Sequence, residues 1–228
     1  MAGLGFDGGC RSRGDASVAA AAASEPVCGY AAGTLIDTPG GARPVEAIVA
    51  GDRVETLDHG PMVVRWVHTE TQAFAGLPEA ARPVLIAAGA FGPDCPKRDL
   101  VVAPGHRILV GALGQIDGTF GGQCFAPARA LTRLRCIRPM MGRAEIRWSH
   151  FVLDRHEVVR ANGCYSESLR LSRSILDGLK PFKRRRLEQA FRLRQAPMTL
   201  PARDCLSELE TQAGLARYRR SGMAAKVA

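Results

Sequence analysis

Four side chains that can carry acid–base or nucleophilic chemistry are spread along this sequence: Cys28, His106, Asp154 and His156. A cysteine thiolate is a strong nucleophile, and an imidazole or carboxylate beside it can take up the thiol proton. The first question for the fold is therefore whether these four residues can meet in one site.

Cys28 has an unusual target within reach, because it directly follows Val27 near the start of the chain. An ordinary cysteine has a pKa near 8.5, so only a few per cent is thiolate at neutral pH unless a neighbour helps. The thiol could attack an external substrate, or it could attack the Val27 carbonyl in an N-to-S acyl shift. Tethering the two reacting groups removes about 7–11 kcal/mol of the barrier in good geometry. The leaving nitrogen then needs a proton, for which His106 is a candidate donor.

Short apolar segments separated by Gly and Pro predict an all-β domain from about 28 to 170. No helix of a dozen residues separates the segments, which disfavours a parallel βαβ architecture. Strands are predicted at 34–38, 53–57, 62–68, 83–88, 100–103, 106–110, 123–125, 145–153 and 156–160, with turns at 58–61 and 162–163. The segments 69–81 and 111–122 are predicted loops.

The C-terminal segment 171–228 is predicted to be a basic, partly helical tail. Helices are expected over 183–193 and 204–217, the second capped by Asp204. The formal net charge is +9, and residues 170–194 hold nine Lys and Arg residues against Asp177 and Glu188 alone. Such a segment could bind nucleic acid or an anionic membrane. We favour a solvated helix that packs on the β domain, with no specific nucleic-acid partner.

Residues 1–27 are rich in Gly and Ala and are predicted to be a disordered leader that matches a signal peptide poorly. No apolar run approaches the roughly 20 residues of a membrane span. Seven cysteines show no CxxC pair, so neither a metal site nor a disulfide framework is predicted. The compartment stays open between the cytoplasm and secretion by a non-classical route.

A longer pattern connects these residues. It consists of Cys28, Gly33-Thr34-Leu35-Ile36-Asp37-Thr38, Arg43-Pro44-Val45-Glu46, Gly51-Asp52-Arg53-Val54, Gly60-Pro61, Val64-Arg65-Trp66-Val67, the stretch from Arg98 to Arg107, the stretch from Leu153 to Val159, Asn162-Gly163 and Ser166-Glu167-Ser168. The order and spacing resemble a Hint domain, the module shared by hedgehog autoprocessing domains and inteins, and most of all its bacterial forms.

The resemblance implies a compact all-β horseshoe with its ends close together. It implies that Cys28 is the first-position nucleophile and that His106 aids the acyl shift. It also implies that Asp154 and His156 transfer protons in later steps, and that no cofactor or metal is needed.

Two departures from the family pattern limit the predicted reaction. Ala103 stands where many members have a threonine three residues before the histidine, and Asn162 follows Ala161 with no later His-Asn pair. We therefore predict cleavage at the Val27–Cys28 bond without full splicing. The chain's own leader would be the substrate, an external nucleophile (water or a thiol) would resolve the thioester, and the chain would be a monomer.

Alternative interpretations remain at each position. Cys28 and His106 could be structural, and Asp154 could cap a turn or pair with Arg155 or Arg107. Among the other candidates, His150 could support the site, His59 and His68 are expected to face solvent, Cys164 to be a buried or turn thiol, and Trp66 and Trp148 to be core. For the whole chain, the alternatives are a non-catalytic Hint-like binding or secretion-associated module and, less favoured, a nucleic-acid-associated protein.

Overall fold

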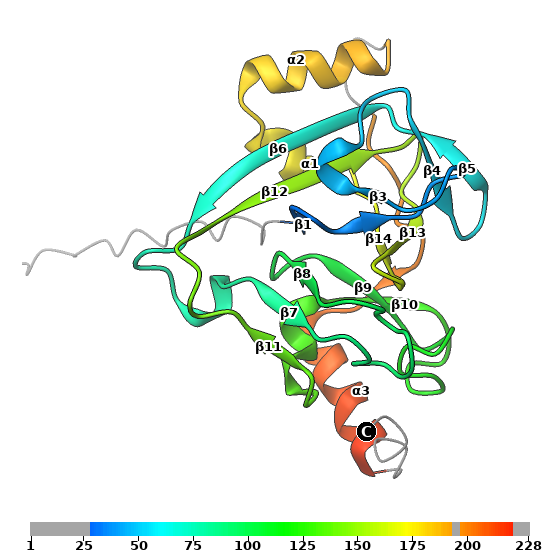
Figure 1. The fold of residues 1–228 in the computed structure, drawn as a ribbon, viewed down its shortest axis with the longest axis vertical. Helices are drawn as coiled ribbons and strands as arrows, with labels where there is room; N and C mark the ends of the chain where they lie inside the picture. The colour runs from blue at the N-terminus through cyan, green and yellow to red at the C-terminus, as the bar shows by residue number, and fades with distance from the viewer. Residues whose placement is uncertain (1–27, 193–196, 221–228) are drawn as a thin grey trace, which may run out of the picture.

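The computed structural model describes residues 28–192 and 197–220, so the predicted leader lies outside the described residues. The predicted all-β fold is confirmed, because the strands of the described residues form two sheets that enclose the main core. A helical C-terminal extension follows the sheets. Figure 1 shows two of its helices at one end of the molecule and the third at the opposite end.

The first sheet is antiparallel and holds the start of the described chain in its middle. Its order is β11 (Ile137–Pro139), β7 (Val84–Ile86), β8 (Leu100–Val102), β1 (Tyr30–Ala31), β12 (Glu145–Val152) and β6 (Trp66–Ala73). Tyr30 pairs with Val102 on one side and with Ser149 on the other. Since β1 is an inner strand, the residues just before it are held close to both neighbouring strands.

The second sheet brings distant segments to the same place. Its order is β15 (Asp204–Cys205), β10 (Cys124–Pro127), β9 (Arg107–Val110), β14 (Cys164–Glu167), β13 (Val158–Ala161), β2 (Leu35–Ile36) and β3 (Arg43–Pro44). In addition, β4 (Arg53–Thr56) pairs with β13 and forms a hairpin with β5 (Gly60–Val63).

The β13–β14 hairpin confirms the predicted turn at Asn162-Gly163. Both turn residues have positive φ, 48° at Asn162 and 87° at Gly163. A two-residue hairpin turn of this kind requires positive φ at both positions, which Asn and Gly tolerate best. The turn places β14 next to β9, so residues near 106 and 167 become neighbours.

Helical segments are short. The 3₁₀ helices are η1 (Val45–Ala47), η2 (Glu79–Ala81) and η3 (Ala128–Arg133), and the α-helices are α1 (Arg173–Gly178), α2 (Pro181–Ala190) and α3 (Glu208–Arg220). The predicted cap at Asp204 is wrong, because Asp204 lies in β15. Ser207 caps α3 instead: its hydroxyl accepts from the Glu210 amide, and its own amide donates to the Glu210 carboxylate.

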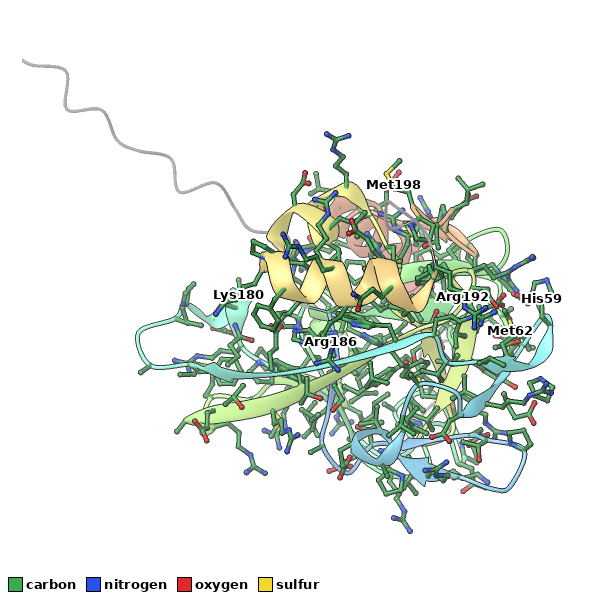
Figure 2. All side chains as sticks on the ribbon, turned by 90° about the horizontal axis from the view of Figure 1, so that it is seen from above. His59, Met62, Lys180, Arg186, Arg192 and Met198 are labelled. Atoms are coloured by element: carbon green, nitrogen blue, oxygen red, sulfur yellow. The ribbon has the colours of Figure 1, made fainter. Side chains whose placement is uncertain are left out.

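The predicted helix at 183–193 corresponds to α2, which packs on the β domain. Leu187 is fully buried in a small cluster with Trp66 and Val152. Figure 2 shows α2 across the molecule as seen from above, with Lys180 near one end and Arg192 near the other. Lys180, Arg185, Arg186 and Arg192 are exposed, which is typical of a solvated basic face. No helix among the residues that the structure describes is both long and apolar enough to cross a membrane.

One strand prediction and one loop prediction are wrong in the same region. The predicted strand 62–68 is split, since β5 ends at Val63 and β6 begins at Trp66 in the other sheet. Between them the Val64 amide bonds to Asp52 and the Arg65 amide bonds to Val152, so the chain crosses from one sheet to the other. The predicted loop 69–81 holds five more strand residues, because β6 pairs with β12 over its whole length up to Ala73.

Candidate active site

Cys28 lies immediately before β1, where backbone contacts fix its neighbour. The Ala103 amide donates to the Gly29 carbonyl at 3.0 Å, which extends the pairing of β1 with β8. The Cys28 thiol is half-buried, and its Sγ donates to Glu167 Oε1 at 3.2 Å. It also lies 3.8 Å from the Gly105 carbonyl oxygen. The nucleophile candidate is therefore in contact with a carboxylate.

Glu167, the last residue of β14, is only 3% exposed and accepts hydrogen bonds at both oxygens. Oε1 accepts from the Arg107 amide at 2.9 Å as well as from Cys28, and Oε2 accepts from His156 Nε2 at 3.1 Å. Burial raises the pKa of this carboxyl. The hydrogen bond from His156 and the charges of the neighbouring imidazoles together lower it by more, so the net pKa shift is downward. Glu167 is thus a carboxylate at neutral pH and can accept a proton.

His106 lies just before β9 and contacts the backbone next to Cys28. Its Nδ1 accepts from the Gly29 amide at 3.3 Å, and its ring meets the edge of the Tyr30 ring at 4.3 Å between centroids. Burial lowers the pKa of His106 to about 4. The imidazole is therefore neutral at pH 7, with its proton on Nε2. That buried Nε2 has no hydrogen-bond partner within residues 28–192 and 197–220.

His156 precedes β13 and is also buried. Its Nδ1 accepts from the Ala202 amide at 3.1 Å, so its proton is on Nε2, which donates to Glu167. The structure thus gathers three of the four predicted site residues, Cys28, His106 and His156, around Glu167.

Asp154 does not join this cluster in the described part of the chain. Its carboxylate makes a two-point ion pair with Arg65, at 2.8 and 2.9 Å, on the exposed surface. The partner of Asp154 is thus neither of the two arginines considered as alternatives, Arg155 and Arg107, but Arg65 from the crossing between the sheets.

Glu167 is the residue that the sequence interpretation missed. It belongs to the stretch Ser166-Glu167-Ser168 of the family pattern, but no role was assigned to it. Its position depends on the pairing of β14 with β9, where Ser166 lies opposite Ile108. The signal that could have identified it is an acidic residue in the return strand of an Asn-Gly hairpin, between two serines that are also buried.

A second histidine cluster lies behind Gly29. His68 and His150 face each other across β6 and β12 with ring centroids 5.5 Å apart, and Glu70 lies 3.2 Å from His68 Nε2 and 3.7 Å from His150 Nε2. Lys183 of α2 reaches His68 Nε2 at 3.1 Å. The solvent-facing position predicted for His68 is wrong, since its side chain is 11% exposed and stacked between aromatic rings. Cys164, Trp66 and Trp148 are buried as predicted.

Gly29 is held between the two histidine clusters. Its amide points at His106, and a Cβ on its other side would lie 2.7 Å from His150 Cε1. Its φ of 143° is also one that residues with side chains rarely adopt. Only glycine fits between these rings without a shift.

One ligand atom each from Cys28, His106 and Glu167 lies within 4.8 Å of the others. Thiolate, imidazole and carboxylate are the donors that zinc accepts in proteins, so the trio could also hold such an ion. The hydrogen bonds of the cluster are sufficient to arrange these groups, and no metal enters the reaction proposed below.

Comparison with known proteins identifies the family. The sequence profile of the Hint domain matches residues 28–173, well over half of the chain, and the chain therefore belongs to the Hint domain family. The match begins at Cys28 and ends shortly after Glu167, so it contains the whole cluster.

Solved structures show weak likenesses. A bacterial intein-like domain from Clostridium thermocellum is 15% identical with a TM-score of 0.43, over 63% of this chain and 99% of its own. The MchDnaB-1 intein is 12% identical with a TM-score of 0.39, over 61% of this chain and 99% of its own. The gp41-1 intein is 15% identical with a TM-score of 0.36, over 61% and 98%. No curated protein matches the chain.

Proposed function

We propose that this chain is an autoprocessing Hint domain that cleaves itself at the Val27–Cys28 peptide bond through a thioester on Cys28. The single observation that carries the proposal is the hydrogen bond of 3.2 Å from the Cys28 thiol to the buried Glu167 carboxylate. We take residues 28–170 as the processing domain, 1–27 as the leader and 171–228 as the tail.

In the first step Glu167 takes the thiol proton. The Cys28 sulfur attacks the carbonyl carbon of Val27, an S–C bond forms, and the C–N bond to Cys28 breaks. The Cys28 nitrogen leaves as an amine and takes up a proton, so that charge and atoms balance. General-base help of this kind contributes about 10²–10⁴-fold to a rate.

His106 is the proposed partner for the leaving nitrogen. It already accepts from the Gly29 amide, one residue beyond that nitrogen. Because its pKa is about 4, it does not carry a standing positive charge at neutral pH. For the step to balance, the proton that Cys28 loses to Glu167 must reach the leaving nitrogen, and we propose that His106 passes it on. The Cys28, Glu167 and His106 atoms lie within 4.8 Å of one another, a separation that one bridging water spans but a direct hydrogen bond does not.

His156 has a supporting role in this scheme, because its Nε2–H stabilises the Glu167 carboxylate. The proton-transfer role predicted for Asp154 has no support from its position beside Arg65. The sequence has no His-Asn pair after residue 162, so the thioester is resolved by water or a thiol rather than by splicing.

The test uses the full chain with an affinity tag placed upstream of Val27, incubated with dithiothreitol and followed by intact mass. We expect loss of the upstream peptide in the wild type and an intact chain in Cys28→Ala. Cys136→Ala is the matched control, since Cys136 is an exposed thiol outside the cluster. A wild-type chain that stays intact would contradict the proposal and favour a non-catalytic Hint-like module.

A further inference from the structure

The C-terminal extension donates a hydrogen bond to the candidate site from beyond the family match, which ends at residue 173. The Ala202 amide lies 3.1 Å from His156 Nδ1. His156 is 2% exposed, and its other ring nitrogen donates to Glu167. A backbone group of the extension is therefore linked through one imidazole to the carboxylate that holds Cys28.

The residue after Ala202 fastens this part of the chain to the β domain. Arg203 makes two hydrogen bonds to the Asp58 carboxylate, at 2.7 and 2.9 Å, and a third to Gln123 at 2.6 Å. The two-point pairing of a guanidinium with a carboxylate fixes direction as well as distance. The Ala202 amide is therefore held in place by its neighbour's side chain.

The following residues continue the attachment. Strand β15 runs parallel to β10, with Cys205 opposite Phe125, and the Leu206 amide donates to the Phe125 carbonyl at 2.8 Å. The Leu206 carbonyl in turn accepts from the Arg107 side chain at 3.1 Å. Arg107 is also the residue whose amide donates to Glu167.

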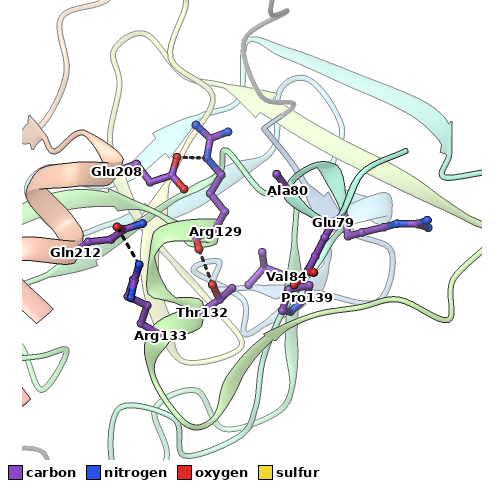
Figure 3. A pocket seen from close by; sticks show the side chains of 10 residues that line it. Glu79, Ala80, Val84, Arg129, Thr132, Arg133, Pro139, Glu208 and Gln212 are labelled. Carbon is purple, nitrogen blue, oxygen red and sulfur yellow. Dashed lines mark hydrogen bonds and ion pairs between the residues drawn. The ribbon is translucent and has the colours of Figure 1, made fainter. Parts of the chain in front are cut away.

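Helix α3 holds the far end of the extension. Glu208 pairs with Arg129 at 2.9 Å, and Gln212 accepts from Arg133, so α3 is joined to η3 (Figure 3). Leu215 is buried in the main core. The segment that carries Ala202 is thus anchored to the β domain on its C-terminal side.

The contacts of His156 with Ala202 on one side and Glu167 on the other favour the same ring nitrogen as the protonated one. A neutral imidazole has one N–H donor and one acceptor nitrogen. An amide N–H at Nδ1 requires a lone pair there, which puts the proton on Nε2, facing Glu167 Oε2. The opposite tautomer would place a lone pair against the Glu167 carboxylate and leave the half-buried Ala202 amide without its acceptor, and both changes are unfavourable away from water.

We propose that Ala202 is a positioning residue, whose amide fixes the His156 tautomer so that Nε2–H is directed at Glu167. The extension is then part of the processing site rather than a separate tail. The effect on cleavage rests on the proposed function, whereas the effect on the tautomer does not.

The test compares Ala202→Pro, which removes the N–H, with Ala202→Gly, which keeps it. The ¹⁵N and ¹³C chemical shifts of the His156 ring report which nitrogen is protonated, and His156→Gln assigns the signals. In the wild type and in Ala202→Gly we expect the proton on Nε2. In Ala202→Pro we expect a mixture of tautomers and cleavage at least tenfold slower.

Ala202→Pro with wild-type ring shifts would overturn the proposal, whether or not cleavage slows. A tautomer change in Ala202→Pro without any cleavage in the wild type would support the positioning role and contradict the proposed function instead. If Ala202→Pro does not fold, Arg203→Gln is used in its place. This variant removes the hydrogen bonds of Arg203 to Asp58 but keeps the Ala202 amide. In a folded Arg203→Gln chain, unchanged His156 ring shifts together with an Ala202 amide that has lost its protection from hydrogen exchange would also overturn the proposal, because the amide would then have left His156 without changing the tautomer.

Discussion

Two clusters lie on opposite sides of Gly29, and each contains one carboxylate and two imidazoles. In the first, Glu167 accepts from His156 and Cys28, with His106 beside it. In the second, Glu70 lies between His68 and His150, with Lys183 beside His68. Both are built from strands of distant sequence.

The clusters differ in what else their carboxylate meets. Glu167 is buried and hydrogen-bonded to a thiol, whereas the Glu70 side chain is 40% exposed and lies next to His68 and His150. In the proposed reaction, the first carboxylate therefore has a thiol to deprotonate. The second cluster contacts α2 through Lys183, and its His150 ring packs against Gly29. A carboxylate beside two histidines therefore does not by itself identify the candidate active site. The thiol that is hydrogen-bonded to the carboxylate distinguishes it.

The largest predicted effect tests the difference between Glu167 and Glu70 directly. Glu167→Gln removes the proton acceptor of Cys28 but keeps a side chain of the same shape, so we expect thiol-induced cleavage to slow by about 10²–10⁴-fold. Glu70→Gln is the matched change in the second cluster, and we expect a rate within about tenfold of the wild type. Intact mass against time measures both, and equal losses in the two variants would contradict the division of roles.

A second prediction concerns pH, since each cluster holds a buried histidine with a lowered pKa. For His106 burial lowers the pKa from 6.5 to about 4. Between these values the unfolded chain binds more protons than the folded one, so the free energy of unfolding falls as pH falls. The decrease attributable to His106 reaches about 3 kcal/mol near pH 4.

Urea unfolding between pH 7 and pH 4 measures this dependence. We expect His106→Gln to flatten it, but not fully, because burial also lowers the pKa of His150 with the same sign. A folded His106→Gln chain with an unchanged pH dependence would show that His106 is not the buried neutral base described above.

A third prediction tests whether Gly29 couples the two clusters. Gly29→Ala adds a methyl group 2.7 Å from His150 Cε1 at a strained φ, and we expect a loss of about 2–3 kcal/mol in the free energy of unfolding. Gly33→Ala is the control, since Gly33 has φ of 85° but no atom within 4 Å of the added methyl group. Thermal or urea unfolding compares them, and the contact with His150 would be excluded as a cause if both lost the same amount.

The smallest predicted effect concerns the attachment of α2. Lys183→Met removes the contact with His68, and we expect a loss of about 1 kcal/mol in the free energy of unfolding. Arg185→Met, at an exposed position of the same helix, should change it by less than about 0.5 kcal/mol. Urea unfolding of both variants provides the comparison, and equal values would show that Lys183 does not anchor α2.

Much of the fold could be predicted because local patterns determine it. The predicted hairpin around Asp58 and the turn at Asn162-Gly163 are encoded by turn residues between apolar strands, and both are present. The first turn lies at 57–59 rather than 58–61, because Gly60 and Pro61 already pair in β5. The crossing at Val64 and Arg65 could not be predicted, because the sequence continues to resemble a strand while its hydrogen-bond partners change sheets. The strand character of Thr69 to Ala73 was hidden by polar side chains on an edge strand.

The site was predicted in part for a related reason. Cys28, His106 and His156 have residue types that indicate chemistry on their own, and the family pattern gave their order. Glu167 belongs to the family pattern, but only the pairing of β14 with β9 shows that it meets Cys28. The Ala202 contact is made by a backbone amide, which residue type does not reveal. Asp154 has the right residue type, but only the fold shows that its side chain turns outward to Arg65.

The most direct measurement is the chemical identity of the released peptide's C-terminus after treatment of the tagged full chain with hydroxylamine. The account predicts a hydroxamate on Val27 in the wild type, because hydroxylamine traps a thioester at Cys28, and no such peptide from Cys28→Ala. A wild-type chain that keeps its full mass, or one that releases the same hydroxamate when Cys28 is alanine, would contradict it.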